Sequence, residues 1–409
     1  MASEIEYYSL ASLGVPPIHI AQATKSGSLL LLNGLGSFGY ANDNVHPLDA
    51  SHRDMQIQTL FDALDTKLNS PGRPLMRMLA TEQRYTSATT VPIYHRHRQA
   101  AWAPVPPSTS VLQERLMSAQ QATSVDGIAA NADLVEYLRV EGIDIPATSG
   151  FVPVSRAGSL YCVAGFMAAH GEGDLGGIAP EVRIPEGHQW KGDRVRREVG
   201  YIWDHKLLPI LQQLQLAPHH ISRAAVFYTE PDEAAEVIAA WKGLFGDEPP
   251  LTNYICVREQ GLAITDAKVE INLLLDAQRI HTPNAPQYTV LPDGTSAYSR
   301  FGDHLIYMIY PDALGGPSIS IDVHPAEYET HSMAEKLAQS LERHGAGFGQ
   351  VARIAQAYLH RRDVLHSCRI WEKYFGENPI PLSASFAPRL PLNNIQSCIE
   401  AWVYKPLET

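Results

Sequence analysis

The chain has 409 residues and a formal net charge of −12, with 45% hydrophobic and 19% charged residues. That length predicts two to four domains, and the composition is that of a globular rather than a disordered protein. The acidic balance argues against nucleic acid or anionic lipid as a partner, because neither is attracted to negative charge. No run of ~20 apolar residues occurs, and the first residues are acidic, so we expect no membrane span, no secretory signal and a cytoplasmic location.

The spacing and surroundings of the four cysteines indicate whether they form disulfide bonds or bind a metal. Cys162, Cys256, Cys368 and Cys398 form no CxxC pair and no short metal-ligand spacing. Three of them lie in apolar runs, where a free cysteine is usually a small buried side chain. We therefore expect free thiols and no disulfide framework.

The chain divides into three copies of a repeated domain, for which the sequence matches are given below. The first copy, residues 1–132, has the weakest pattern of apolar residues. Apolar runs and helical spacing predict strands at residues 29–32, 75–80, 108–116 and 123–129 and helices at residues 55–68 and 94–101. Residues 133–150 carry a short helical patch at Leu134, Tyr137 and Leu138 and then Pro-Ala-Thr-Ser-Gly, which predicts a linker.

The second copy, residues 151–280, has a clearer pattern. We expect strands at residues 160–164, 221–229, 251–258 and 268–275 and helices at residues 195–214 and 232–245. Pro209 should kink or split the first of these helices, because proline lacks the amide proton that a helix interior needs. Residues 171–193, rich in Gly and Pro, predict a long loop.

The third copy, residues 281–409, shows the same order of elements. Its expected strands are residues 305–310, 318–323, 351–359, 383–386 and 397–404, and its expected helices are residues 333–341 and 363–375. The third copy therefore reads as ββαβαββ, which is the order that we expect for every copy and which belongs to the α+β class.

The repeat itself rests on two matches in one register. Residues 241–250 read WKGLFGDEPP and residues 371–380 read WEKYFGENPI, an offset of 130 residues. At the same offset residues 269–271 face residues 399–401, which aligns Glu270 with Glu400. Two matches in one register are hard to obtain by chance, and a unit of this length suits a small domain rather than a solenoid repeat.

Several of these segments resemble the RidA/YjgF family. They are FYT at residues 227–229, FGDEPP at 245–250, KVEI at 268–271, APRLP at 387–391, and the first-copy stretches 106–111 and 125–129. Domains of that family have a chorismate-mutase-like ββαβαββ fold and typically form homotrimers with ligand clefts between subunits. The resemblance therefore implies three fused domains in one chain that form an intramolecular pseudo-trimer, with a small-molecule substrate and the possibility of a homodimer.

The resemblance also implies an acidic residue near the end of each copy, here Asp126, Glu270 and Glu400, which helps to position or activate water. A carboxylate among Val, Ile and Leu should be partly desolvated, and desolvation raises its pKa towards acid/base use. The alternative is a strand carboxylate that faces solvent.

One family signature is missing. RidA-type imine deaminases hold the substrate carboxylate with an arginine in a Pro-x-Arg-Ser-like segment. That position is Pro107 or Ser108 in the first copy, Leu251 in the second and Leu382 in the third. We therefore do not expect a standard 2-imino acid deaminase.

Five further residues are candidates for substrate binding. Asn253, near the family's active-site strand, is expected to orient the ligand, and Gly165 is expected to let bare backbone approach it. Arg98, Arg258 and Arg389 are candidates for binding a substrate anion. The alternatives are a solvated basic patch for Arg98 and structural salt bridges for the other two.

Three common motifs lack the context that they need. Residues 34–39 fit GxGxxG, but turn residues rather than a helix follow them, so we do not expect dinucleotide binding. His95 and His97 have no third metal ligand nearby, and no GxSxG elbow of a serine esterase is present. We expect neither a metal nor a cofactor.

The leading hypothesis is an enzyme that acts on an imine, enamine or carbonyl metabolite by carboxylate-assisted hydrolysis or proton transfer. Glu270 or Glu400 would act in a cleft between repeats, and we expect unequal clefts. A chorismatase-like enzyme acting on chorismate or a related cyclic acid is one alternative, and a non-catalytic ligand-binding or scaffold protein is the other. Cyanuric acid hydrolases and barbiturases rank lower, because their Ser-Lys pairs are not found in all three copies.

Overall fold

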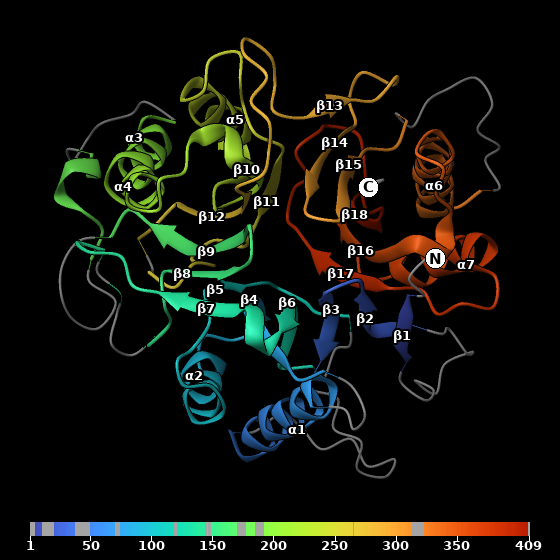
Figure 1. Cartoon of the computed structure of the whole chain (residues 1–409), viewed down its shortest axis with the longest axis horizontal. Coiled ribbons are helices and arrows are strands. Elements are labelled where there is room, and N and C mark those ends of the chain that lie inside the picture. The colour runs from blue at the N-terminus through green and yellow to red at the C-terminus, as the bar shows by residue number, and fades with distance from the viewer. Residues whose placement is uncertain are drawn as a thin grey trace.

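The computed structural model describes residues 5–9, 20–36, 50–69, 74–117, 121–143, 145, 149–169, 177–184, 192–264, 266–312 and 323–407. These residues form three six-stranded sheets, and the helices lie on the outer side of each sheet (Figure 1). The expected α+β architecture of three repeats is confirmed.

The first repeat has the sheet order β1-β2-β3-β6-β4-β5. Its elements are β1 (Glu6–Ser9), β2 (Ala21–Ser26), β3 (Leu29–Gly36), α1 (Ala50–Leu68), β4 (Met76–Tyr85), α2 (Thr90–Ala101), β5 (Ser108–Leu112) and β6 (Thr123–Asn131).

The second repeat has the order β11-β10-β12-β9-β8-β7. Its elements are β7 (Val135–Leu138), β8 (Val154–Ala157), β9 (Leu160–Met167), α3 (Asp193–Ile202), α4 (Leu208–Gln213), β10 (Ile221–Tyr228), α5 (Ala234–Gly243), β11 (Thr252–Cys256) and β12 (Val269–Asp276).

The third repeat has the order β13-β14-β15-β18-β16-β17. Its elements are β13 (Thr289–Val290), β14 (Ala297–Phe301), β15 (His304–Ile309), α6 (Pro325–Arg343), β16 (Val351–Tyr358), α7 (Asp363–Phe375), β17 (Leu382–Phe386) and β18 (Ser397–Tyr404).

Each repeat therefore begins with three antiparallel strands, one more than the sequence predicts. In the second repeat this extra strand is β7, which pairs with β8 and lies within the segment expected to be a linker with a helical patch. The helical patch is correct only for Leu134, which lies in a 3-10 helix at Ala132–Leu134. It is wrong for Tyr137 and Leu138, which lie in β7, because the spacing of a few apolar side chains cannot distinguish a short strand from a helix. The strand expected at residues 318–323 falls almost wholly outside the described residues, as do most of the loop at 171–193 and the turn after residue 36.

Pro209 has the effect predicted for it. The helix at residues 193–213 is divided into α3 and α4 by a π-helical turn, Trp203–Leu207, and Pro209 lies in the first turn of α4. The missing amide proton of proline removes one helical hydrogen bond, so a wider turn before it is a favourable way to continue.

The three sheets meet in one central apolar cluster. It gathers Leu31 and Ile128 from the first repeat, Cys162 from the second, and Phe301 and Trp402 from the third. Each repeat also has its own core between sheet and helices. A sheet has two faces to cover, and here helices cover the outer face while the other two sheets cover the inner one. All four cysteines are buried and free, as expected, and no described helix is long and apolar enough to cross a bilayer.

The same β-bulge occurs in the same strand of every repeat. The ladder shifts between Met78 and Ala80 in β4, between Ile221 and Arg223 in β10, and between Val351 and Arg353 in β16. A bulge is a specific backbone feature, so its recurrence fixes which residues are equivalent. Ala80, Arg223 and Arg353 occupy the same place in the three sheets.

A buried side chain from the first long helix of each repeat caps the last strand. Glu198 accepts hydrogen bonds from the amides of Lys268 and Val269 (2.7 and 3.0 Å), and Glu329 accepts from Gln396 (2.8 and 3.0 Å). The first repeat uses Gln56, which accepts from the amide of Ala122 (3.2 Å). Burial raises the pKa of both glutamates to about 7, against the lowering effect of these hydrogen bonds.

We expect Glu329→Gln to stabilise the protein at pH 8. A carboxyl whose pKa is raised on folding destabilises the folded state as pH rises from about 4.5 to about 7, so the neutral amide removes a cost of roughly 1–3 kcal/mol above that window. Below pH 4.5 the two proteins should be equally stable. Denaturant unfolding at both pH values measures the difference, and Glu335→Gln, an exposed residue of the same helix, is the control. Lower stability of the variant at pH 8 would contradict the expectation.

Candidate functional site

The bulges show that Glu270 and Glu400 are not equivalent. In each repeat the strand that carries the bulge pairs with the last strand of that repeat. The residue two positions after Ala80, Arg223 or Arg353 is paired in the three repeats as Glu82 with Asp126, Ala225 with Asn272, and Ala355 with Glu400. Glu400 therefore corresponds to Asp126 and Asn272, while Glu270 corresponds to Ser124 and Cys398. The alignment of Glu270 with Glu400 by a constant offset is wrong by two residues.

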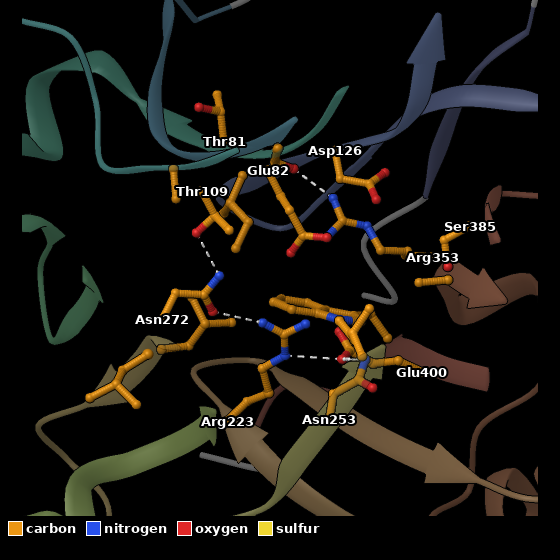
Figure 2. Close-up of a pocket in the computed structure, with 18 of the residues that line it drawn as sticks. Thr81, Glu82, Thr109, Asp126, Arg223, Asn253, Asn272, Arg353, Ser385 and Glu400 are labelled. Carbon is orange, nitrogen blue, oxygen red and sulfur yellow. Dashed lines mark hydrogen bonds and ion pairs between the residues drawn. The ribbon is translucent and has the colours of Figure 1, made fainter. Parts of the chain in front are cut away.

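A central cavity lies where the three sheets meet. It has a volume of about 80 Å³, and side chains from all three repeats line it (Figure 2). Its charged lining residues are Glu82, Arg84, Asp126, Arg223, Arg353 and Glu400. The bulge and ladder positions of the three repeats thus converge, although they are far apart in the sequence.

Asp126 and Arg84 form the group that the first repeat contributes. Arg84 donates to Asp126 and to Glu82, both at 2.6 Å. Asp126 also accepts from the amide of Gly34 (2.6 Å) and from Ser383 of the third repeat (2.8 Å). Burial alone would raise the pKa of Asp126, but the charge of Arg84 and these bonds hold it below its ordinary value.

Glu400 is the centre of a second group, shared by the second and third repeats. One carboxylate oxygen accepts from Arg223 (3.0 Å) and Asn253 (2.9 Å), and the other accepts from Trp402 (2.8 Å). Arg223 also donates to Asn272 (3.1 Å), as Figure 2 shows. Although burial opposes it, the charge of Arg223 keeps the pKa of Glu400 below its usual range. A carboxylate held ionised with both oxygens occupied is poorly suited to acid/base chemistry, contrary to the expected raised pKa.

Arg353 has no carboxylate partner among the described residues. It donates to the carbonyls of Leu32 (2.8 Å) and Gly127 (2.6 Å) and to Asn33 (3.2 Å), and its guanidinium lies over the ring of Trp402, 5.3 Å from the centroid. Burial lowers its pKa. These contacts hold the side chain in place through Nε and Nη2, and they leave Nη1 available towards the cavity.

Glu270 lies at the interface of the first and second repeats, next to the cavity but outside its lining. Its carboxyl lies over Gly165, where Thr109 of the first repeat also approaches. Burial, reinforced by the charge of Glu82, raises the pKa of Glu270 to about 8. One of its oxygens, Oε2, is buried without a hydrogen-bond partner in the described part of the chain. Glu270 therefore has the raised pKa expected of an acid/base group.

No protein-family model and no curated protein sequence matches the chain. Among solved structures it is similar to a chorismatase, at 12% identity over 65% of this chain and 78% of that one, with a TM-score of 0.41. It is also similar to Rv2704 of Mycobacterium tuberculosis, a member of the YjgF/YER057c/UK114 family, at 19% identity over 35% of this chain and 98% of that one, with a TM-score of 0.25. RidA from the Antarctic bacterium Psychrobacter matches at 12% identity over 34% and 98%, with a TM-score of 0.26.

The hydrogen-bond ladders also show which residues of the three repeats are equivalent at the position where the sequence resemblance expected an arginine. The ladders place Ser108, Thr252 and Leu382 at equivalent positions in β5, β11 and β17. The residue of the second repeat is therefore Thr252 and not Leu251, but none of the three is an arginine.

Arg98 lies away from the cavity, on the helix side of the first sheet. It is completely buried and donates to Ser108 (2.6 Å) and to the carbonyl of Ser149 (2.5 Å). In the second repeat Trp241 makes the equivalent bond to Thr252 (2.9 Å). Arg98 thus takes the place of a core tryptophan. Both predictions for it, an anion-binding residue and a solvated basic patch, are wrong.

The other two candidate arginines do not line the cavity either. Arg389 is partly exposed and binds Asp232 (3.3 Å) and Asn393 (2.9 Å), which is the structural alternative considered for it. Arg258 is half-buried, and its Nε has no partner among the described residues. No described group of three or more His, Cys, Asp or Glu residues has the geometry to hold a metal ion.

The sequence interpretation missed the arginines that do reach the cavity. Arg223 and Arg353 are separated by the same 130 residues as the two tryptophan motifs, so the repeat itself contained the signal. Arg84 has no counterpart in the other repeats, where Phe227 and Ala357 stand, and its contribution follows only from the packing.

We expect Gly165→Ala to be destabilising. A Cβ at this position would collide with the carboxyl of Glu270 and crowd the hydroxyl of Thr109, and overpacking of this kind costs about 1–3 kcal/mol. Gly200→Ala is the matched control, because no atom lies within 4 Å of its added Cβ and alanine favours the helix. Thermal unfolding of both variants tests this, and a Gly165→Ala protein as stable as the control would show that Glu270 moves freely.

Proposed function

We propose that the protein is a small-molecule enzyme that transfers a proton to or from an imine, enamine or carbonyl metabolite, with Glu270 as the general acid. The observation that carries the proposal is a buried carboxyl with a pKa near 8 and an unpaired oxygen at an inter-repeat interface. Groups with pKa values shifted towards neutrality are concentrated at catalytic sites. Only the second repeat has an acid at this ladder position, in keeping with unequal sites.

In this mechanism the neutral carboxyl of Glu270 protonates the imine nitrogen and makes the adjacent carbon susceptible to water. Water adds to this carbon, one of its protons passes to the nitrogen, and the other returns to the carboxylate of Glu270. The C–N bond then breaks, the carbonyl forms and the amine leaves. Gly165 provides room for the carboxyl, and Thr109 of the neighbouring repeat borders the same space. Without the signature arginine, the carboxylate of a 2-imino acid would lack its usual bidentate partner, so the substrate differs from that of a standard RidA-type deaminase.

A substrate screen of wild type and Glu270→Gln tests the proposal. Imino acids, enamines, chorismate and cyclic amides are assayed for turnover, and we expect kcat for a true substrate to fall about 10²–10⁴-fold in the variant, because the amide cannot donate the proton. Wild-type activity should decline above pH 8, where Glu270 ionises. Glu198→Gln is the matched control, since Glu198 also has a raised pKa but caps a strand.

Equal turnover by wild type and Glu270→Gln would contradict the role of Glu270. Turnover of chorismate that the variant loses would favour the chorismatase-like alternative. Binding without turnover of any compound would favour a non-catalytic ligand-binding protein.

A further inference from the structure

The central cavity is balanced in charge. Its lining carries three guanidinium groups, Arg84, Arg223 and Arg353, and three carboxylates, Glu82, Asp126 and Glu400. A net charge is unfavourable in a poorly hydrated interior unless it is compensated. A ligand with a net charge would leave the filled cavity unbalanced, whereas a ligand with zero net charge would preserve the balance.

Polar atoms of both kinds remain available in the lining. Arg223 uses Nε and Nη1 for Glu400 and Asn272, and Arg353 uses Nε and Nη2 for protein oxygens. Among the described residues no acceptor engages Nη2 of Arg223 or Nη1 of Arg353. On Glu82, Oε1 accepts from Arg84, and Oε2 has no described donor. Figure 2 shows Glu82, Arg223 and Arg353 reaching into the same space from three strands.

The size of the cavity restricts the ligand. One water molecule needs roughly 10–15 Å³ of such space, so a cavity of about 80 Å³ holds a molecule of roughly five to eight non-hydrogen atoms. Arginine pairs well with carboxylate groups, and a carboxylate such as that of Glu82 pairs with an ammonium group.

We propose that the central cavity is a binding site for a small zwitterion of the α-amino acid class, with its carboxylate at Arg223 and Arg353 and its ammonium group at Glu82. Glycine, alanine and serine have the required size and zero net charge. Glu270 does not line this cavity, so the proposal concerns binding alone and does not depend on the proton transfer proposed above.

Calorimetric titration with alanine and with two analogues that each lack one of its charged groups tests the proposal. L-Alanine is a zwitterion, propionate lacks its ammonium group, and ethylamine lacks its carboxylate. We expect wild type to bind alanine at least ten-fold more tightly than either analogue, and not to bind phenylalanine, which is too large. Propionate binding equal to or tighter than alanine, or no binding of glycine, alanine or serine, would overturn the proposal.

A variant that changes the charge of the cavity gives a second, independent test. Glu82→Gln leaves one surplus positive charge, so its preference should reverse, with propionate now binding more tightly than alanine. Glu136→Gln, at an exposed ion pair with Arg156, should keep the wild-type preference. Thermal unfolding confirms that each variant is folded, and if Glu82→Gln is not, the wild-type comparison of the three ligands decides. An unchanged preference in folded Glu82→Gln would show that Glu82 does not contact the ligand and would contradict the proposal.

Discussion

Glu400→Ala is expected to lower the free energy of unfolding by about 3–5 kcal/mol, because it leaves a buried guanidinium without its carboxylate. Arg223, Asn253 and Trp402 all donate to Glu400, which is only 3% exposed. The pKa of Glu400 is lowered on folding, so its stabilising effect is present above about pH 4.5 and is lost as pH falls through the folded value. Denaturant unfolding at pH 7 measures the loss.

The control for this variant is Glu136→Ala, which removes an exposed ion pair of similar length (2.8 Å, with side chains 39% and 55% exposed). Exposed pairs contribute no more than about 1 kcal/mol, since water screens them. A loss below about 1 kcal/mol for Glu400→Ala would mean that Arg223 is compensated in another way and that Glu400 is available for chemistry.

Glu270→Gln is expected to have the opposite effect on stability, and this effect should depend on pH. The pKa of Glu270 rises from 4.5 to about 8 on folding, so the wild type loses stability as pH rises through that window and reaches a plateau above it. The loss is about 5 kcal/mol, from roughly 1.4 kcal/mol for each pKa unit. We therefore expect the variant to equal wild type near pH 4.5 and to exceed it at pH 9.

Unfolding curves at several pH values between 4.5 and 9 measure this difference directly. Glu198→Gln should give a similar but smaller curve that reaches its plateau near pH 7, because the pKa of Glu198 is about 7. A difference between Glu270→Gln and wild type that is constant with pH would show that Glu270 titrates normally, and the proposed acid would lose its main support.

Much of the fold could be predicted from the sequence because the repeat is carried by large, buried side chains. Trp241 and Trp371 are fully buried in equivalent helices, and a core position of this kind tolerates few alternatives. Pro209 likewise acts locally, through its own missing amide proton. The first repeat lacks this signal in its sequence, because Arg98 stands in the place of the tryptophan.

The edge strand β7 could not be predicted from the sequence, because it is too short to show a strand pattern. A strand of four residues contains only two alternations, and its identity as a strand depends on its pairing with β8. Short edge strands are therefore determined by the sheet that they join rather than by their own pattern.

By itself the sequence determined the number of repeats, their α+β class and the buried free thiols, because each of these depends on residue identity or local periodicity. Only the tertiary structure decided which carboxylates share a site. Side chains two residues apart on a strand point to the same face, so a two-residue shift between repeats leaves the alternating pattern unchanged. The hydrogen-bond ladders and their bulges remove that ambiguity, and they separate Glu270 at the interface from Glu400 in the cavity.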